Sequence, residues 1–201
     1  MMIYDISQPV FSCEVYPGDP KPERQTVCSM ERGDSYNLTA FSMCAHNGTH
    51  LDAPCHFLPD GRGVDAIPLE KCIGLSYVHT HDGNVIAEDA AEILRRAELL
   101  HPEAAKRILI RGRATVTQEA AAVFASAGIH LIGNESQSVG PENAPMGVHL
   151  ILLKADVVLL EGIRLGAVPD GVYLLNCAPL NLSDADGAPC RAVLIKPERL
   201  I

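Results

Sequence analysis

Four side chains that can bind a metal or transfer protons lie within one short segment, HNGTHLDAPCHF at residues 46–57. They are His46, His50, Asp52 and His56. Clustered imidazoles repel one another when protonated and are costly to bury unpaired, and coordination to a metal beside a carboxylate removes both problems. Imidazole and carboxylate ligands suit zinc, manganese or iron, so the donor set predicts a divalent metal without choosing among these three.

The local backbone is expected to be extended, although His46 and His50 have the spacing of zinc ligands on one helical face. Gly48 lies between them and Pro54 follows soon after, and both residue types are poor in helix interiors. Residues two apart in an extended segment share a face. We therefore expect His50 and Asp52 to point the same way, with a turn at Gly48 bringing His46 to join them.

Ligands from elsewhere in the chain would be needed to complete a catalytic site. The second half offers His149 at the start of HLILLK and Glu161 at the end of VVLLEG. By spacing alone, the more ordinary roles for these two are a capping or surface histidine and a solvated carboxylate. His79 and His81 are predicted to lie on the surface without a carboxylate partner.

Length and composition predict one compact mixed domain spanning residues 1–201, because 201 residues with 47% hydrophobic content fill one core. The formal net charge of −9, without a basic cluster, argues against nucleic acid as a partner. The segment MMIYDISQPV has no signal-peptide pattern, and no apolar run is long enough for a membrane span. A cytoplasmic location without membrane contact is the resulting expectation.

The seven cysteines are odd in number and irregularly spaced, which is typical of reduced thiols rather than a disulfide framework. No CxxC pair is present, so a zinc ribbon is not indicated. Cys55 is expected to fill space rather than to bind a metal, and Cys44 to lie in the core.

Hydrophobic periodicity predicts a mixed α/β chain with more strand than helix. Pro17 and Gly18 indicate a tight turn, and residues 58–68 a long surface loop. A capping box at Thr115 and Gln118 is predicted to begin a helix that stops at Gly128 and forms a right-handed parallel crossover between its flanking strands. The predicted helices cover 88–100, the stretch ending at residue 127, and 146–154; the predicted strands cover 24–30, 37–45, 72–81, 107–112, 129–133, 157–163, 172–180 and 191–195.

The histidine segment resembles the H-x-G-T-H-x-D-x-P-x-H-F signature of the metal-dependent cyclase-like hydrolases, which include bacterial kynurenine formamidase and isatin hydrolase. The resemblance extends through DISQPV and YPGD near the start, IG with Ser138 in the middle, and HLILLKADVVLLEGIRL and VPDGVYLLNCAPLNLSDADGAPCRAVLI. It implies a single mixed-sheet domain of the swivelling β/β/α type that assembles as a homodimer or homotetramer.

The resemblance also implies roles for individual residues. The first metal would be held by His46, His50 and Asp52, and the second by Asp52 and His149, with Glu161 reaching both. The metals would be one or two zinc ions, with manganese as the alternative. The last histidine of the segment, His56, would be the general acid/base for attack of metal-activated water on a small amide.

The resemblance leaves the substrate open. N-formylkynurenine, an arylformamide, is expected first, and a cyclic amide or lactone second; a metal-binding homologue without hydrolytic activity is the rival from another class. The formamidases carry Trp where this chain has Tyr16, which would stack on an aromatic substrate or be an ordinary turn residue. Asn134 and Glu135 depart from the Thr-Asp pair of other members, so we expect a remodelled pocket wall there.

Overall fold

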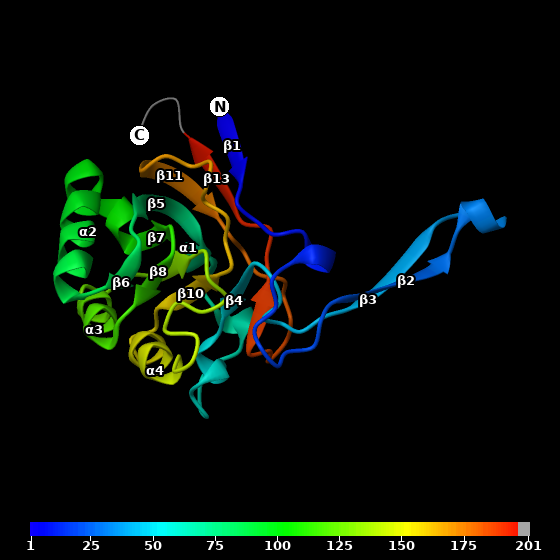
Figure 1. The fold of residues 1–201 in the computed structure, drawn as a ribbon, viewed down its shortest axis with the longest axis horizontal. Helices are drawn as coiled ribbons and strands as arrows, with labels where there is room; N and C mark the ends of the chain where they lie inside the picture. Colours follow the sequence, from blue (N-terminus) through cyan, green and yellow to red (C-terminus); the bar gives the residue numbers. More distant parts are fainter. Residues whose placement is uncertain (197–201) are drawn as a thin grey trace.

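The computed structural model describes residues 1–196, and the end of the predicted domain at residue 201 lies outside them. A nine-stranded mixed sheet is its framework (Figure 1). The strands are β1 (Met2–Asp5), β4 (His50–Asp52), β5 (Ile73–Thr80), β7 (Arg107–Arg111), β9 (Leu131–Asn134), β10 (Val158–Glu161), β11 (Gly171–Asn176), β12 (Gly187–Pro189) and β13 (Val193–Lys196). Their order across the sheet is β1-β13-β11-β5-β7-β9-β10-β4-β12. The four central strands β5, β7, β9 and β10 are parallel to one another. Every other strand pair in this sheet is antiparallel.

Both faces of the central strands are buried, as parallel strands require. Helices α2 (Ala87–Leu100), α3 (Gln118–Ser126) and α4 (Met146–Lys154) cover one face, while α1 (Leu69–Cys72) is a single turn before β5 (Figure 1). On the helix side, Ile108 and Ile132 pack into the first core. Leu109 and Leu160 point to the opposite face and pack into a second core with residues of the antiparallel strands. The predicted mixed, strand-rich α/β fold is therefore confirmed.

Most predicted elements occur, but the start of α3 was predicted wrongly. Thr117 is the N-terminal cap of this helix, and its Oγ1 accepts a hydrogen bond from the amide of Ala120 at 3.2 Å. Thr115 lies instead in the short strand β8 (Ala114–Val116), which pairs in parallel with β6 (Gly83–Val85). The predicted stop at Gly128 is confirmed by its φ of 64° just beyond the helix end.

The segment 58–68 is only partly the surface loop that its glycines and prolines predict. It contains a 3-10 turn at Val64–Ala66, and Val64 and Ile67 are buried in the second core. The other 3-10 turns are Val10–Ser12, Met30–Arg32, Pro54–His56 and Pro102–Lys106. The segment that follows His56 is therefore fixed to the body of the molecule rather than mobile over it.

Strands β2 (Glu23–Cys28) and β3 (Leu38–Ser42) form an antiparallel hairpin that extends far from the body (Figure 1). Nearly all of its residues are exposed, including Val27, Leu38 and Phe41. We call this hairpin, residues 23–42, the arm. Among the described helices, none has the length and hydropathy needed to cross a membrane.

Candidate metal and catalytic site

The three-residue strand β4 places two candidate ligands on one face. His50 and Asp52 point into the site, while Leu51 between them is buried in the second core. This is the alternation of an extended strand, and it confirms the backbone that Gly48 and Pro54 predict. Pairing with β10 on one side and β12 on the other holds this short strand in the sheet.

A turn before β4 brings His46 to the same place. Gly48 has φ of 67°, and a Cβ there would lie 2.9 Å from the Cβ of Cys13, so glycine is required for both conformation and space. The turn is closed by the amide of Asn47, which donates to the carbonyl of Cys44 at 3.2 Å. As a result, Nδ1 of His46 lies 3.0 Å from Oδ1 of Asp52.

Two distant elements supply the remaining candidates. His149 lies within α4, and its Nδ1 donates to the carbonyl of Pro145 at 2.9 Å, which leaves Nε2 facing the site. Glu161 ends β10, and its Oε1 accepts a hydrogen bond from the amide of Val139 at 2.7 Å. Both residues are about as buried as Asp52 itself. His149 is therefore not a capping or surface histidine, and Glu161 is not a solvated carboxylate.

The structure brings all five residues together as two groups that share Asp52. The possible ligand atoms of His46, His50 and Asp52 lie within 4.8 Å of one another, and so do those of Asp52, His149 and Glu161. His149 Nε2 is 3.4 Å from Asp52 Oδ2 and 3.2 Å from Glu161 Oε1. These are the two groupings that the family resemblance implies.

The donor set fits a divalent metal. His50 Nε2 and Asp52 Oδ2 are buried and have no hydrogen-bond partner among the described residues. His50 Nδ1 donates to the carbonyl of Gly48 at 3.0 Å, so the lone pair of Nε2 faces Asp52 and Glu161, each 3.5 Å away. Buried, unpartnered ligand atoms of imidazole and carboxylate type are what a metal would satisfy.

Charge coupling within this group shifts the pKa values strongly. Burial alone would lower the pKa of His50 and of His149, but Asp52 and Glu161 outweigh burial and raise each pKa to about 10. Burial likewise would raise the pKa of Asp52, yet the imidazoles of His149, His46 and His50 hold it well below its usual value. A cation is thus favoured at this position, whether it is carried by protons or by a metal.

His56 lies beside the five ligand candidates, and its possible ligand atom forms a third group, within 4.8 Å, with those of His46 and Asp186. It ends the turn Pro54–His56, and its ring stacks on that of His46 with centroids 4.1 Å apart. The ring of Phe57 packs edge-on against it at 4.5 Å. Burial lowers the pKa of His56, so the ring is neutral at pH 7 and able to accept a proton.

A cavity of about 350 Å³ opens onto these side chains. Tyr16 lies in its wall, as the resemblance implies, and its hydroxyl donates to the carbonyl of Glu142. Tyr16 also begins a tight turn in which Gly18 has φ of 100°, so the two roles proposed for it are compatible. The cavity is lined by Tyr16, Asp19, Cys44, His46, His50, His56, Phe57, Gln137, Ser138, Pro145, His149, Glu161 and Asp186.

The prediction that Asn134 and Glu135 form part of the pocket wall is wrong. Asn134 is fully buried, and its Nδ2 donates to the carbonyls of Ala114 and Ser138. The carboxylate of Glu135 accepts hydrogen bonds from backbone amides outside the cavity. Gln137 occupies the wall instead, and both polar atoms of its amide are buried without a hydrogen-bond partner among the described residues.

Two smaller expectations are also corrected. Cys44 is half-buried in the cavity wall instead of in the core, whereas Cys55 packs against the second core and fills space as expected. His79 and His81 lie away from the site, as expected, but each faces a carboxylate. His79 Nδ1 is 3.7 Å from Asp170, and His81 Nε2 is 3.8 Å from Asp89.

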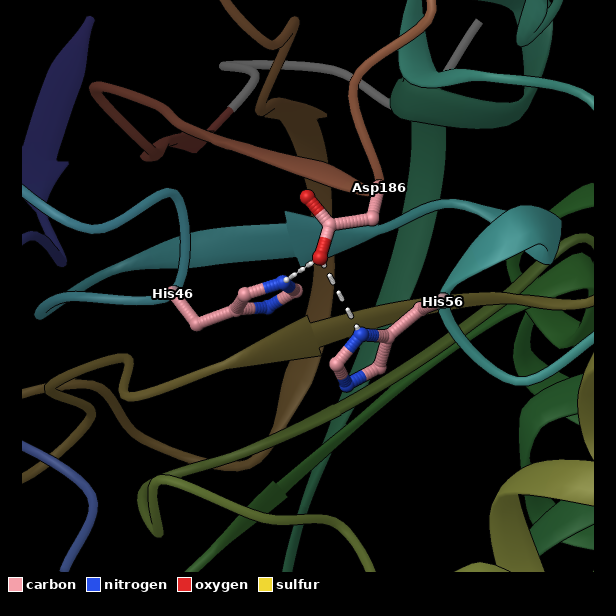
Figure 2. Close-up of side chains that lie close together, drawn as sticks. All are labelled: His46, His56 and Asp186. Atoms are coloured by element: carbon pink, nitrogen blue, oxygen red, sulfur yellow. Dashed lines mark hydrogen bonds and ion pairs between the residues drawn. The ribbon is translucent and has the colours of Figure 1, made fainter. Parts of the chain in front are cut away.

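Asp186 is a further member of the site, and its sequence context gives no signal for it. Its Oδ2 lies 3.0 Å from Nε2 of His46 and 3.5 Å from Nδ1 of His56 (Figure 2). Asp186 is far from the histidine segment in sequence and stands in DADG, which has the composition of an ordinary turn. Only the pairing of β12 with β4 reveals its position.

Comparison with known proteins shows the family. A family model described as "Putative cyclase" matches residues 4–141. The chain is 33% identical to the kynurenine formamidase of Erythrobacter litoralis (strain HTCC2594), covering 96% of this chain and 93% of that protein. It is 34% identical to the kynurenine formamidase of Bacillus anthracis, covering 94% and 95%. The chain therefore belongs to the cyclase family, and the predicted family is confirmed.

Solved structures agree on the fold. A protein titled as a potential metal-dependent hydrolase with cyclase activity aligns with a TM-score of 0.82 at 26% identity, over 98% of this chain and 99% of that one. Isatin hydrolase A from Labrenzia aggregata aligns with a TM-score of 0.79 at 21% identity, over 98% and 94%. The second likeness bears on the fold alone.

Proposed function

We propose that this protein is a metal-dependent amide hydrolase whose first substrate class is the arylformamides, with N-formylkynurenine converted to kynurenine and formate. The observation that carries the proposal is the convergence of five imidazole and carboxylate side chains, from the β4 segment, α4 and β10, around buried atoms that have no hydrogen-bond partner among the described residues. The two relatives reported above, named kynurenine formamidase, support the substrate class.

One or two divalent ions, with zinc first and manganese as the alternative, would be held by His46, His50 and Asp52 and by Asp52, His149 and Glu161. When bound, such an ion supplies Lewis acidity and makes water a nucleophile at neutral pH. The carbonyls of Gly48 and Pro145 accept the Nδ1 protons of His50 and His149, so Nε2 of each ring would be the ligand atom.

His56 would transfer the proton in this reaction. It lies in the cavity wall and stacks on the ring of His46, and burial lowers its pKa, so that its imidazole is neutral at pH 7. A neutral imidazole can take a proton from the attacking water and return it to the leaving nitrogen. A protein that only stored metal would have no use for such a group.

The cavity suits a small aromatic amide. Phe57 and Tyr16 offer ring faces, and the unpartnered amide of Gln137 offers both a donor and an acceptor. An amide substrate presents the complementary pair of groups, so Gln137 is placed to orient it.

The test is hydrolysis by protein that is stripped of metal and reloaded with zinc or with manganese. N-formylkynurenine and isatin are supplied in parallel, and release of kynurenine and opening of the isatin ring are followed. A kcat/KM of roughly 10⁴ M⁻¹s⁻¹ or better for N-formylkynurenine lies in the range of physiological substrates. Turnover of isatin but not of N-formylkynurenine would show that the substrate class is the cyclic amides. No turnover of either compound with metal bound would favour a metal-binding homologue without hydrolytic activity.

A second copy of this chain is the proposed partner, in a homodimer or homotetramer. The arm carries Val27, Leu38 and Phe41 at 47%, 45% and 58% exposure, and it extends into solvent (Figure 1). Apolar side chains on a projecting hairpin gain most by packing against another subunit. Sedimentation of the wild type against a Phe41→Asp variant tests this, since the variant should shift toward monomer.

The cytoplasm is the proposed location. All seven cysteines are free thiols, including the buried neighbours Cys72 and Cys177, and free thiols suit a reducing compartment. Thiol titration of the purified protein, with and without denaturant, measures how many of the seven cysteines are free, and disulfides found there would contradict this location.

A further inference from the structure

The three candidate ligand histidines differ in what holds the nitrogen that faces away from the metal position. For His50 and His149, a carbonyl two or four residues away accepts the Nδ1 proton, so each ring is fixed by its own segment. His46 has no such local partner among the described residues. Its Nε2 instead contacts a carboxylate 140 residues away, Oδ2 of Asp186, at 3.0 Å.

A second observation concerns the residue that follows Asp186. Gly187 lies beneath the ring of His46, and a Cβ on this glycine would lie 2.6 Å from Cε1 and 3.1 Å from Nδ1 of that ring. Gly187 is also the register partner of Asp52 in the pairing of β12 with β4. The Asp186-Gly187 pair therefore forms a cradle for His46, in which the glycine leaves room for the ring and the carboxylate accepts a hydrogen bond from its outer edge.

From this geometry we propose that Asp186 is a positioning residue that holds His46 in the tautomer required for metal binding and also orients His56. A proton on Nε2 of His46, donated to Asp186, leaves the lone pair on Nδ1, which is the atom facing Asp52. Carboxylates that orient ligand histidines in this way raise metal affinity. This inference rests on the proposed metal site.

The same carboxylate oxygen reaches the catalytic candidate. Oδ2 of Asp186 lies 3.5 Å from Nδ1 of His56, and Figure 2 shows it between the edges of the two rings. The rings of His46 and His56 are stacked at an interplanar angle of 29°, so one acceptor can serve both. With Nδ1 of His56 turned toward Asp186, Nε2 on the opposite side of the ring is left for proton transfer.

The position of Asp186 at the cavity mouth makes it suitable for substitution. Its side chain is 52% exposed, and its backbone carbonyl, which accepts from the amide of Ala53, is unaffected by a change of side chain. The variants are Asp186→Ala and the nearly isosteric Asp186→Asn. The matched control is Asp184→Asn, an exposed carboxylate on the same loop, which tests whether loss of charge alone has an effect.

The first measurement is zinc affinity of the metal-free proteins, by competition with a chromogenic chelator and without substrate. We expect both Asp186 variants to bind zinc about 10- to 100-fold more weakly than wild type, with Asp184→Asn unchanged. If two ions bind, only one should weaken, because the group of Asp52, His149 and Glu161 does not include His46. Equal affinity in wild type and Asp186→Ala, or an equal loss in Asp184→Asn, overturns the inference.

The second measurement is turnover of N-formylkynurenine at saturating zinc. Asp186→Ala should lower kcat with little change in KM, because Asp186 acts on the rings rather than on the substrate. A raised KM with unchanged kcat would make it a substrate contact and overturn the positioning role. Wild-type protein that binds neither zinc nor manganese would overturn the proposed function and this inference together, whereas a zinc-binding wild type matched by Asp186→Ala sinks the inference alone.

Discussion

His50 and Glu161 are directly opposite each other on the antiparallel strands β4 and β10, and Nε2 of the histidine lies 3.5 Å from Oε2 of the glutamate. Residues in register on neighbouring strands share a face. The same register sets Asp52 opposite Leu159, so the two acids occupy successive positions along one face of the sheet. The spacing of His50, Asp52 and Glu161 is therefore set by the strand pairing.

Substitution of Asp52 should remove metal from both positions, because Asp52 belongs to both ligand groups. Asp52→Ala protein, purified with zinc and passed through gel filtration, should retain less than half of the wild-type metal by elemental analysis. Asp60→Ala, an exposed carboxylate eight residues further along, is the control and should retain all of it. Wild-type metal content in the Asp52 variant would contradict its shared role.

Substitution of His56 should separate metal binding from catalysis. His56→Ala is expected to keep the wild-type metal content and to lose about 100-fold or more in kcat, since general acid/base catalysis contributes at least that much. His81→Ala is the control, because His81 binds the carbonyl of Asn84 away from the cavity. Undiminished turnover in the His56 variant would remove this residue from the proton-transfer role.

The size of the aromatic side chain at residue 16 should set the affinity for aromatic formamides. Tyr16→Trp should lower KM for N-formylkynurenine by about two- to tenfold and Tyr16→Ala should raise it, as expected for an added or lost ring contact. Tyr16→Phe isolates the hydrogen bond to the carbonyl of Glu142. An aliphatic formamide serves as the control substrate, and equal changes for both substrates would argue against stacking.

Acid should weaken the attachment of the segment that follows the site. The carboxylate oxygens of Asp156 lie 2.5 Å from Nζ of Lys71 and 2.5 Å from Nη2 of Arg62. The backbone of Asp156 has φ of 61°, a conformation that Asn also tolerates. Burial alone would raise the pKa of Asp156, but the two cations outweigh it and lower the pKa from its usual 3.8. The stabilisation is therefore complete above pH 3.8 and is lost as pH falls through the lower pKa of the folded state.

Urea unfolding of wild type and Asp156→Asn at pH 7 and at pH 2 to 3 tests this sign. The wild type should be more stable by about 1 kcal/mol or less at pH 7, since the pair is partly exposed. The difference should shrink toward zero in acid. A difference that grows as the pH falls would show that the carboxylate is not held in its charged form.

The local backbone of the histidine segment could be predicted from its own residues. Gly48 and Pro54 exclude a helix, so the strand alternation of His50 and Asp52 follows from residues within the segment, and so does the turn that adds His46. Helix α2, whose apolar residues recur at helical spacing, is likewise a local property. In these cases the backbone conformation depends on neighbours a few residues away.

The distant residues that join this segment could be identified only from the packing of the whole chain. His149, Glu161 and Asp186 reach it because α4 packs beside β10 and because β4 inserts between β10 and β12. Asn134 and Glu135 were misplaced for the same reason, since the direction of a side chain leaving a strand end depends on the packing beyond it. Strand order and register depend on burial of two core faces formed by residues from the whole chain. The spacing of residues within one short segment therefore does not determine them.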